Sequence, residues 1–455
     1  MPPSTLDHAR RTSGQGRPRT RQPPQVVVRK GNRICFVGRV NALAHRQFMS
    51  CVHQSRERGY EDVVLDFSTC ESAFPIGMIP LLSGADTLRR EKIDISVTLP
   101  EREELARLFR NTNWAHFLEP ARFSRSDTIH DRHLATQRFS EFDQQQKLVN
   151  DFMDVVMRNM TLERDVIAGL EWSINEVTDN VLNHAECAEG GVVQVSTFTD
   201  ARKIAFGVAD SGRGILSSLR EGHPELRTDA QAIGEAMKAG ITRDPDAGQG
   251  NGIAGALRIA TMSGGSFEIT SGLAQIVTRT DRTGAQPPTT EAKVYERKEP
   301  QRFVGTLVYA ELGLDAQFHL SEALGFSGEP HQPTDLIEAQ YETESGDAIV
   351  LRLRDESTGF GSRPAGRQLR TKCLNLLNAE PDKPLVLDWT AVPLVSSSFA
   401  DELVGKLFAS LGPLAFSARV RNVGMEAMVR GLVDKAIMQR VAQVANGTRD
   451  DTDTK

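Results

Sequence analysis

The sequence lacks any hydrophobic run that approaches the roughly 20 residues needed to cross a bilayer as a helix. Only five cysteines occur in 455 residues, and none forms a Cys-x-x-Cys pair. Neither sign of charge dominates, since 54 basic and 60 acidic side chains leave a net charge of −6 spread along the chain. These absences argue against a membrane-spanning protein, a disulfide framework, a zinc site and a dedicated nucleic-acid surface. They favour a protein of the reducing cytoplasm.

Residues 1–24 have almost no large apolar side chains, while five arginines occur among them. A secretory signal requires an apolar stretch, and this segment has none. The composition predicts a disordered basic tail, with a transit peptide or an arm that touches nucleic acid as the alternatives.

With 39% hydrophobic and 25% charged residues, the chain has the composition of ordinary soluble globular proteins. Its length predicts roughly three domains, because single cores rarely grow beyond about 200 residues. Short β-rich runs alternate with helical stretches in the first and last thirds of the chain. This alternation predicts an α/β fold built in layers.

A helix is predicted over 175–185, because apolar residues recur through this region at spacings of three or four. Glu176 and Asn180 are four residues apart and therefore share another face of it, one turn after the other. A carboxylate there can accept a proton from the group that attacks a γ-phosphate, and an amide oxygen is a ligand that Mg²⁺ accepts. A polar helix face without chemistry is the alternative. The predicted buried stripe consists of Leu170, Ile174, Val177 and Val181.

Residues 204–209 are predicted to form an apolar strand with Asp210 at its end. A carboxylate in this place can accept a hydrogen bond from the exocyclic amine of adenine, which guanine cannot donate from the same position. Gly212 and Gly214 follow, and their lack of side chains lets the backbone approach a base and a ribose. Alone, an Asp-x-Gly-x-Gly segment is more often a tight turn than a binding site.

Gly248, Gly250 and Gly252 stand directly before 253–257, which has the composition of a helix start. Backbone N–H groups of a glycine-rich loop at a helix N-terminus bind phosphate through partial positive charge and close approach. Thr306, directly before another predicted apolar strand, is a further candidate for a phosphate contact.

In order and spacing, these segments resemble the N, G1 and G2 boxes of the GHKL ATPases, the superfamily of gyrase, Hsp90, histidine kinases and MutL. The resemblance spans residues 150–314 and implies a Bergerat α/β sandwich that binds ATP and Mg²⁺. It implies that Glu176 is the catalytic base and that Asn180 is the Mg²⁺ ligand. The nucleotide-binding positions that it implies are Asn180, Asp210, Gly212, Gly214, Gly248, Gly250, Gly252 and Thr306.

Two parts of this region carry further expectations. The segment between Gly214 and Gly248 corresponds to the lid that closes over the nucleotide. The stretch 271–304 departs from compact members of the superfamily, which have a short turn there. It is predicted to be either an extended hairpin or an inserted partner-binding loop.

The outer blocks share a pattern in which Val64–Phe67 matches Val386–Trp389, each followed by a loop and then a helix rich in small and apolar residues. A buried strand with an acidic end, a loop and a helix is the order seen in STAS domains, the fold of anti-sigma-factor antagonists, and both blocks resemble them. Such antagonists carry a phosphorylatable serine in the loop. Phe74–Gly77 lacks a hydroxyl there, whereas Ser397 and Ser398 retain one each. The two serines are candidate phosphoacceptors or simply part of a helix N-cap.

The predicted fold is therefore a layered α/β protein with a GHKL sandwich between two small STAS-like domains. Its predicted parts are a disordered basic tail (1–24), a STAS-like domain (25–120), a helical linker (121–149), a GHKL ATP-binding domain (150–314), a linker (315–338), a STAS-like domain (339–445) and an acidic tail (446–455).

Within the superfamily, the combination resembles anti-sigma-factor serine kinases, whose usual partners are STAS proteins. No sustained apolar heptad flanks His130, so a histidine-kinase phosphoacceptor is not indicated there. The resemblance implies a cytoplasmic signalling protein that cleaves ATP or transfers its γ-phosphate to a protein serine. A STAS or other regulatory protein is the expected partner, and a homodimer is compatible with the sequence. One alternative stays open, a nucleotide-gated interaction module with negligible turnover. A structural STAS assembly with a degenerate ATP fold would need loss of site residues, and the sequence shows no such loss.

Overall fold

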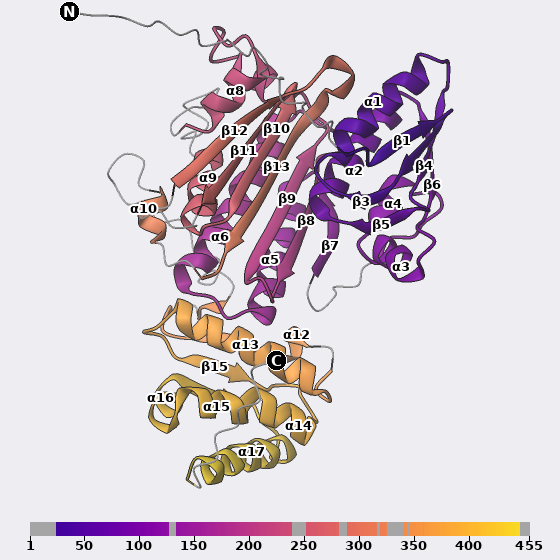
Figure 1. Cartoon of the computed structure of the whole chain (residues 1–455). Coiled ribbons are helices and arrows are strands. Elements are labelled where there is room, and N and C mark those ends of the chain that lie inside the picture. Colours follow the sequence, from indigo (N-terminus) through magenta and orange to yellow (C-terminus); the bar gives the residue numbers. More distant parts are fainter. Residues whose placement is uncertain are drawn as a thin grey trace, which may run out of the picture.

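The computed structural model has the mixed α/β architecture that the sequence predicts, arranged in three blocks (Figure 1). We call them the N-terminal block (24–126), the central block (133–324) and the C-terminal block (341–445). No helix within the described ranges is long and apolar enough to span a membrane. The structure describes residues 24–126, 133–238, 252–281, 289–315, 319–324, 341–343, 345–357 and 359–445.

The N-terminal block is a small α/β layer built on a four-stranded sheet of order β1-β2-β4-β6. β1 and β2 form an antiparallel hairpin, while β2, β4 and β6 are parallel. A second, two-stranded sheet joins β3 and β5. The strands are β1 (Val27–Lys30), β2 (Arg33–Phe36), β3 (Gly38–Val40), β4 (Asp62–Asp66), β5 (Cys70–Ala73) and β6 (Asp94–Thr98); the helices are α1 (Ala44–Arg56), α2 (Pro75–Arg90), α3 (Glu103–Asn111) and α4 (Trp114–Leu118).

Helix α2 is buried along almost its whole length. It begins at Pro75, because proline is favoured at the first helical position, where its missing N–H would have no helical partner. Residues 77–88 are all buried. The reason is that α2 packs between β6 of its own block and strands β8, β9 and β13 of the central block.

The central block contains a seven-stranded sheet of order β12-β11-β10-β13-β9-β8-β7, in which every neighbouring pair is antiparallel. Val208 belongs to the core that this sheet forms with α5, α6 and α9, whereas Ala209 belongs to the core shared with the N-terminal block. Successive strand residues point to opposite faces, so the sheet is covered on both sides. The strands are β7 (His133–Phe139), β8 (Gly191–Phe198), β9 (Lys203–Asp210), β10 (Ser266–Gly272), β11 (Ala274–Asp281), β12 (Thr289–Glu296) and β13 (Phe303–Gly313); the helices are α5 (Phe142–Asn159), α6 (Arg164–His184), α7 (Gly214–Leu219), α8 (Asp229–Ala236), α9 (Gly252–Met262), the 3₁₀ turn η1 (Glu299–Gln301) and α10 (Leu320–Leu324).

The prediction of a helical linker over 121–149 is wrong in its middle. Residues 133–139 form β7, an edge strand of the central sheet, and α5 begins only at Phe142. The buried face of β7 carries a polar residue, Thr136, whose hydroxyl bonds Gln194 Oε1 on β8 at 3.1 Å. A strand of this kind shows no clear apolar alternation in the sequence, because a neighbouring strand satisfies its polar side chain.

Of the two alternatives for 271–304, the structure has the extended hairpin. β11 and β12 pair with each other and widen the sheet on its β10 side. The chain that returns from β12 also contacts the N-terminal block: Arg46 donates to Glu296 O at 2.8 Å, and Arg297 Nη1 lies 3.3 Å from His45 Nδ1. The insertion therefore connects two blocks rather than standing free.

The C-terminal block has a parallel three-stranded sheet of order β14-β15-β16. Its helix α13 packs against α5 of the central block (Figure 1). The fully buried Asn375 on α13 accepts the N–H of Leu162 at 2.8 Å and donates to the carbonyls of Met157 and Met160, both at 2.7 Å. The elements are β14 (Ile349–Arg352), α12 (Leu353–Glu356), α13 (Arg363–Ala379), β15 (Leu385–Asp388), α14 (Ser397–Ala400), the π-helical turn η2 (Asp401–Gly405), α15 (Lys406–Leu411), α16 (Pro413–Arg419), β16 (Val420–Val423) and α17 (Ala427–Ala445).

The N-terminal and C-terminal blocks share a local design. In each, a strand that has parallel neighbours on both sides ends in an aspartate, Asp66 on β4 and Asp388 on β15. Asp66 Oδ1 accepts the N–H of Ser68 at 3.0 Å, and Asp388 Oδ1 accepts that of Thr390 at 2.9 Å. The same turn chemistry thus follows the two strands whose residues match in the sequence.

Candidate nucleotide-binding site

Glu176 and Asn180 on α6 lie against the first residue of α9. A Cβ atom added to Gly252 would lie 2.5 Å from Glu176 Oε2 and 3.3 Å from Asn180 Nδ2. A side chain at 252 would push the Glu176 carboxylate aside, whereas glycine lets the start of α9 approach the carboxylate and the amide with main chain alone. Three residues predicted from two separate segments are therefore brought together.

The environment of Glu176 changes its acidity. Burial raises the pKa of the Glu176 carboxyl to about 7, and the nearby charge of Asp179 acts in the same direction. A carboxyl group with a pKa near neutrality is present in both protonation states, which suits it to take up and release a proton. The site thus contains a candidate general base beside a helix N-terminus.

Asp210 ends β9 and is only 4% exposed. Its Oδ1 accepts the N–H of Gly212 at 2.8 Å. Burial raises the pKa of Asp210 to about 6, although the N–H groups of Gly212 and Thr306 and the cation of Arg90 oppose the rise. The carboxylate therefore dominates at neutral pH, and it keeps acceptor capacity beyond these bonds.

The turn after Asp210 is held against the end of α6. Gly212 packs on Ala185, where an added Cβ would lie 2.1 Å from the Ala185 carbonyl oxygen. Arg213 donates its main-chain N–H to Ala185 O at 3.0 Å and its Nε to His184 O at 3.1 Å. The turn predicted to contact adenine is therefore bonded directly to the end of the helix that carries Glu176 and Asn180.

Ser271, at the end of β10, is a residue of this region that no sequence signal indicates. Its Oγ accepts the N–H of Ile215 at 3.0 Å and donates to Gly305 O at 2.8 Å. Gly214, whose φ is +76°, lies against the same hydroxyl. Ser271 thus joins the loop after Asp210 to β13, a role that depends on the pairing of β10 with β13.

Thr306 lies on β13 beside Asp210. The preceding Gly305 has a φ of +92°, in the left-handed region that favours glycine. A Cβ there would lie 2.6 Å from Asp210 Oδ1. Glycine at 305 therefore lets the main chain pass close to the carboxylate, and the N–H of Thr306 reaches it.

Gly248 and Gly250 lie outside the described residues, as does the end of the predicted lid. The described part of that segment contains α7 and α8. A capping box formed by Thr228 and Gln231 begins α8. Asp229 in its first turn accepts the N–H of Leu273 at 2.9 Å, which places α8 against the turn between β10 and β11.

Ser397 and Ser398 lie at the start of α14 in the C-terminal block. Ser396 is the N-cap: its Oγ accepts the N–H of Phe399 at 3.0 Å and lies 2.9 Å from Ser398 Oγ. Ser397 is exposed and Ser398 is half-buried. Figure 1 places α14 far from α9 and β13, so these serines do not lie at the chain's own Asp210 site.

Glu176→Gln is expected to stabilise the nucleotide-free protein by about 1–3 kcal/mol above neutral pH. Folding raises the pKa of Glu176 from 4.5 to about 7. The contribution of this group to the free energy of unfolding is therefore complete below pH 4.5 and is lost as the pH rises through about 7. Glutamine is uncharged at every pH, so its burial does not become more costly as the pH rises. Urea unfolding at a series of pH values measures the difference, which should vanish below about pH 4.5. A variant less stable than the wild type throughout would contradict the raised pKa.

Comparison with known proteins identifies one family. Residues 365–430 match the STAS-like domain of unknown function (DUF4325). The match runs from α13 through β15 and α14 to the start of α17, and includes Ser397 and Ser398. No curated protein matches the chain. STAS-like domains often mediate protein interactions, and this one fits a regulatory role. The chain therefore carries a STAS-like domain within its C-terminal block.

Proposed function

We propose that residues 150–314 form a GHKL-type ATP-binding unit, through which this protein acts as a Mg²⁺-dependent ATPase or protein serine kinase in cytoplasmic signalling. In this proposal the N-terminal block is a second STAS-like domain, and the two outer blocks carry the interaction with a protein partner. The proposal joins the resemblance of the sequence segments to the geometry of the central block.

The observation that carries the proposal is the close approach of Gly252 to Glu176 and Asn180. Gly252 opens α9, a helix of 11 residues, whose N-terminal N–H groups carry partial positive charge. The attacking nucleophile requires a base, and the triphosphate requires hydrogen-bond donors and an oxygen ligand for its Mg²⁺. Glu176, the N-terminus of α9 and Asn180 would provide these groups. The buried Asp210 supplies an acceptor for the adenine amine.

The residues also fit Mg²⁺. The part of the chain that the structure describes has no cluster of three or more His, Cys, Asp or Glu side chains arranged for a metal. Mg²⁺ is usually held by one or two protein oxygens together with phosphate and water oxygens. Asn180 would hold the ion through its amide oxygen, and the ion would neutralise phosphate charge when bound.

Glu176 is the residue to which we assign the proton transfer. As an oxygen of water or of a serine hydroxyl bonds to the γ-phosphorus, its proton passes to the Glu176 carboxylate. The bond between the γ-phosphorus and the β–γ bridging oxygen breaks, and ADP leaves with that oxygen. Transfer to a protein serine is favoured by analogy with anti-sigma-factor serine kinases, and the exposed Ser397 of another copy or a partner's serine is the acceptor.

A second candidate function is a nucleotide-gated interaction module with negligible turnover. It is favoured by the direct contact between the Asp210 strand and α2 of the N-terminal block, where Ser83 Oγ donates to Asp210 O at 2.6 Å. Both candidates require ATP binding. They differ in whether phosphate is released or transferred.

Asp210→Asn is expected to weaken ATP binding by about 10–100-fold. The asparagine oxygen would accept the N–H groups that Asp210 now accepts, including that of Gly212. The amide NH₂ group of the asparagine would then face the adenine amine, donor against donor. Calorimetric titration with MgATP measures the loss, and titration with MgGTP should show a smaller one, because guanine presents a carbonyl oxygen at this position.

The matched control is Asp315→Asn, which removes the same charge from an exposed ion pair with Arg202 at the end of β13. It should leave nucleotide binding unchanged. If the wild-type protein binds no MgATP, or if Asp210→Asn binds it as tightly as the wild type, the proposed site is wrong.

A further inference from the structure

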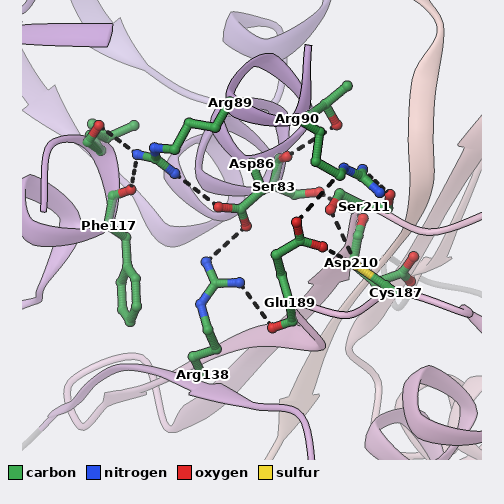
Figure 2. A network of polar contacts seen from close by, with 12 residues as sticks. Ser83, Asp86, Arg89, Arg90, Phe117, Arg138, Cys187, Glu189, Asp210 and Ser211 are labelled. Atoms are coloured by element: carbon green, nitrogen blue, oxygen red, sulfur yellow. Dashed lines mark hydrogen bonds and ion pairs between the residues drawn. The ribbon is translucent and has the colours of Figure 1, made fainter. Parts of the chain in front are cut away.

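Helix α2 of the N-terminal block reaches the strand end that carries Asp210. Figure 2 shows Ser83 and Arg90 of this helix directed toward the Asp210–Ser211 turn. Ser83 Oγ donates to Asp210 O at 2.6 Å, and both groups are buried. Two helical turns later, the Arg90 guanidinium donates to Ser211 O. The carbonyl oxygens of two consecutive residues, Asp210 and Ser211, are thus both held by one helix of another block.

A second set of contacts fixes α2 against the central sheet. The buried carboxylate of Asp86 forms ion pairs with Arg89 on its own helix at 2.9 Å and with Arg138 on β7 at 2.8 Å (Figure 2). Arg138 also donates to Glu189 O at 3.0 Å, and Arg90 Nε lies 3.9 Å from Glu189 Oε1. These bonds set the position of α2 along the sheet, because guanidinium groups bind in defined directions.

Apolar packing adds to the constraint on the same strand. A Cβ on Gly207 of β9 would lie 2.5 Å from Cδ1 of Ile79, so the α2 side chain rests directly on the strand backbone. Gly207 is three residues before Asp210. A shift of α2 would therefore move the strand end together with its carboxylate, because packed interiors transmit displacement.

We propose that Ser83 and Arg90 are positioning residues of the nucleotide site, and that the N-terminal block is a structural part of the adenine pocket. Neither residue touches the reacting atoms. Each holds the main chain from which the Asp210 carboxylate reaches the adenine amine. This inference rests on the proposed ATP site, and it adds a consequence: nucleotide affinity depends on how α2 is seated, and by reciprocity bound nucleotide stabilises α2.

Arg90 also influences the charge of Asp210, which supplies a readout beyond affinity. Arg90 on α2 is the charged side chain that acts on this carboxylate. Glu189 and Cys187, on the turn before β8, contact Arg90 and Ser211 instead. Burial raises the pKa of Asp210 to about 6, and Arg90 holds it below the value that burial alone would produce. Loss of the Arg90 cation should raise that pKa further.

The test is MgATP titration of Arg90→Ala, Arg90→Lys and Ser83→Ala in the full chain, at several pH values. Arg90→Ala and Ser83→Ala should each weaken binding, the former by about tenfold. In the wild type, affinity falls as the pH drops through about 6, when Asp210 is protonated. In Arg90→Ala this fall should begin at a higher pH, and Arg90→Lys should restore the wild-type midpoint.

Arg56→Ala is the matched control, because Arg56 pairs with Glu91 on the exposed side of the same block. It should alter neither affinity nor midpoint. Unchanged affinity and midpoint in both Arg90→Ala and Ser83→Ala, with a wild type that binds MgATP, would overturn this inference and leave the proposed ATP site standing. A wild type that binds no MgATP would remove the ATP site itself, and this inference with it.

Hydrogen exchange of the wild-type protein decides the matter if a variant fails to fold. MgATP should slow exchange in the last turns of α2, around 86–91, as well as in the turn after Asp210. Slower exchange after Asp210 with none in α2 would overturn the inference.

Discussion

Glu176→Gln is expected to lower phosphate release from ATP by about 10²–10⁴-fold while ATP affinity changes little. Glutamine preserves the shape of the side chain beside Gly252 but cannot accept the proton of the attacking oxygen. The burial that raises the pKa of Glu176 to about 7 is also what makes it an effective base near neutral pH. Incubation with γ-labelled ATP, followed by counting of free phosphate and protein-bound label, measures both outcomes of the reaction.

Asp179→Asn is the matched control for this prediction. Asp179 is a neighbouring acid on the same helix, and its charge contributes to the raised pKa of Glu176. The change should therefore lower that pKa and move the activity profile to lower pH, with turnover largely retained. Full turnover in Glu176→Gln would rule out its role as base. A wild type that binds ATP but releases no phosphate and labels no protein would instead favour the nucleotide-gated module.

Lys372→Ala is expected to destabilise the protein by about 3–5 kcal/mol. Lys372 on α13 is 1% exposed and pairs with Asp154 on α5 and Glu356 on α12. Burial alone would lower the pKa of Lys372, but Asp154, Tyr341 and Glu356 outweigh burial and raise it. Without the cation, the carboxylates of Asp154 and Glu356 face each other with less positive charge to offset their repulsion. They lie where the C-terminal block meets the central block.

Urea unfolding of the full chain measures this loss, with Lys147→Ala as the control. Lys147 pairs with Asp151 on the same helix α5, but its side chain is 76% exposed, so its removal should cost at most about 1 kcal/mol. Equal effects of the two substitutions would mean that the Lys372 pair does not support the contact between α5 and α13.

The elements that the sequence predicts correctly are those with a local pattern. The helix with Glu176 and Asn180 follows from the apolar spacing of residues such as Ile174 and Val177, which lie in its buried stripe. The strand before Asp210 follows from an unbroken apolar run, because it is buried on both faces. Val64–Phe67 and Val386–Trp389 also share a local pattern, and each belongs to a strand that ends in an aspartate whose side chain accepts an N–H of the next turn.

The features that the sequence does not predict are those in which a polar residue is satisfied by a distant partner. β7 carries the buried Thr136, which needs Gln194, and Ser271 gains its role from the pairing of β10 with β13. Ser83 and Arg90 look like ordinary residues of a helix in the N-terminal block. Their partners are more than a hundred residues away, so no local spacing can reveal them.

The sequence alone therefore determined which side chains are available for the proposed nucleotide chemistry, because spacing along one helix or at one strand end already places them on a common face. The tertiary structure decided which of them meet and what supports them. Gly252 lies against Glu176, and α2 lies against the Asp210 strand, because helices cover both faces of the central sheet. Burial between those layers, which no single segment encodes, also sets the acidity of the two carboxyl groups.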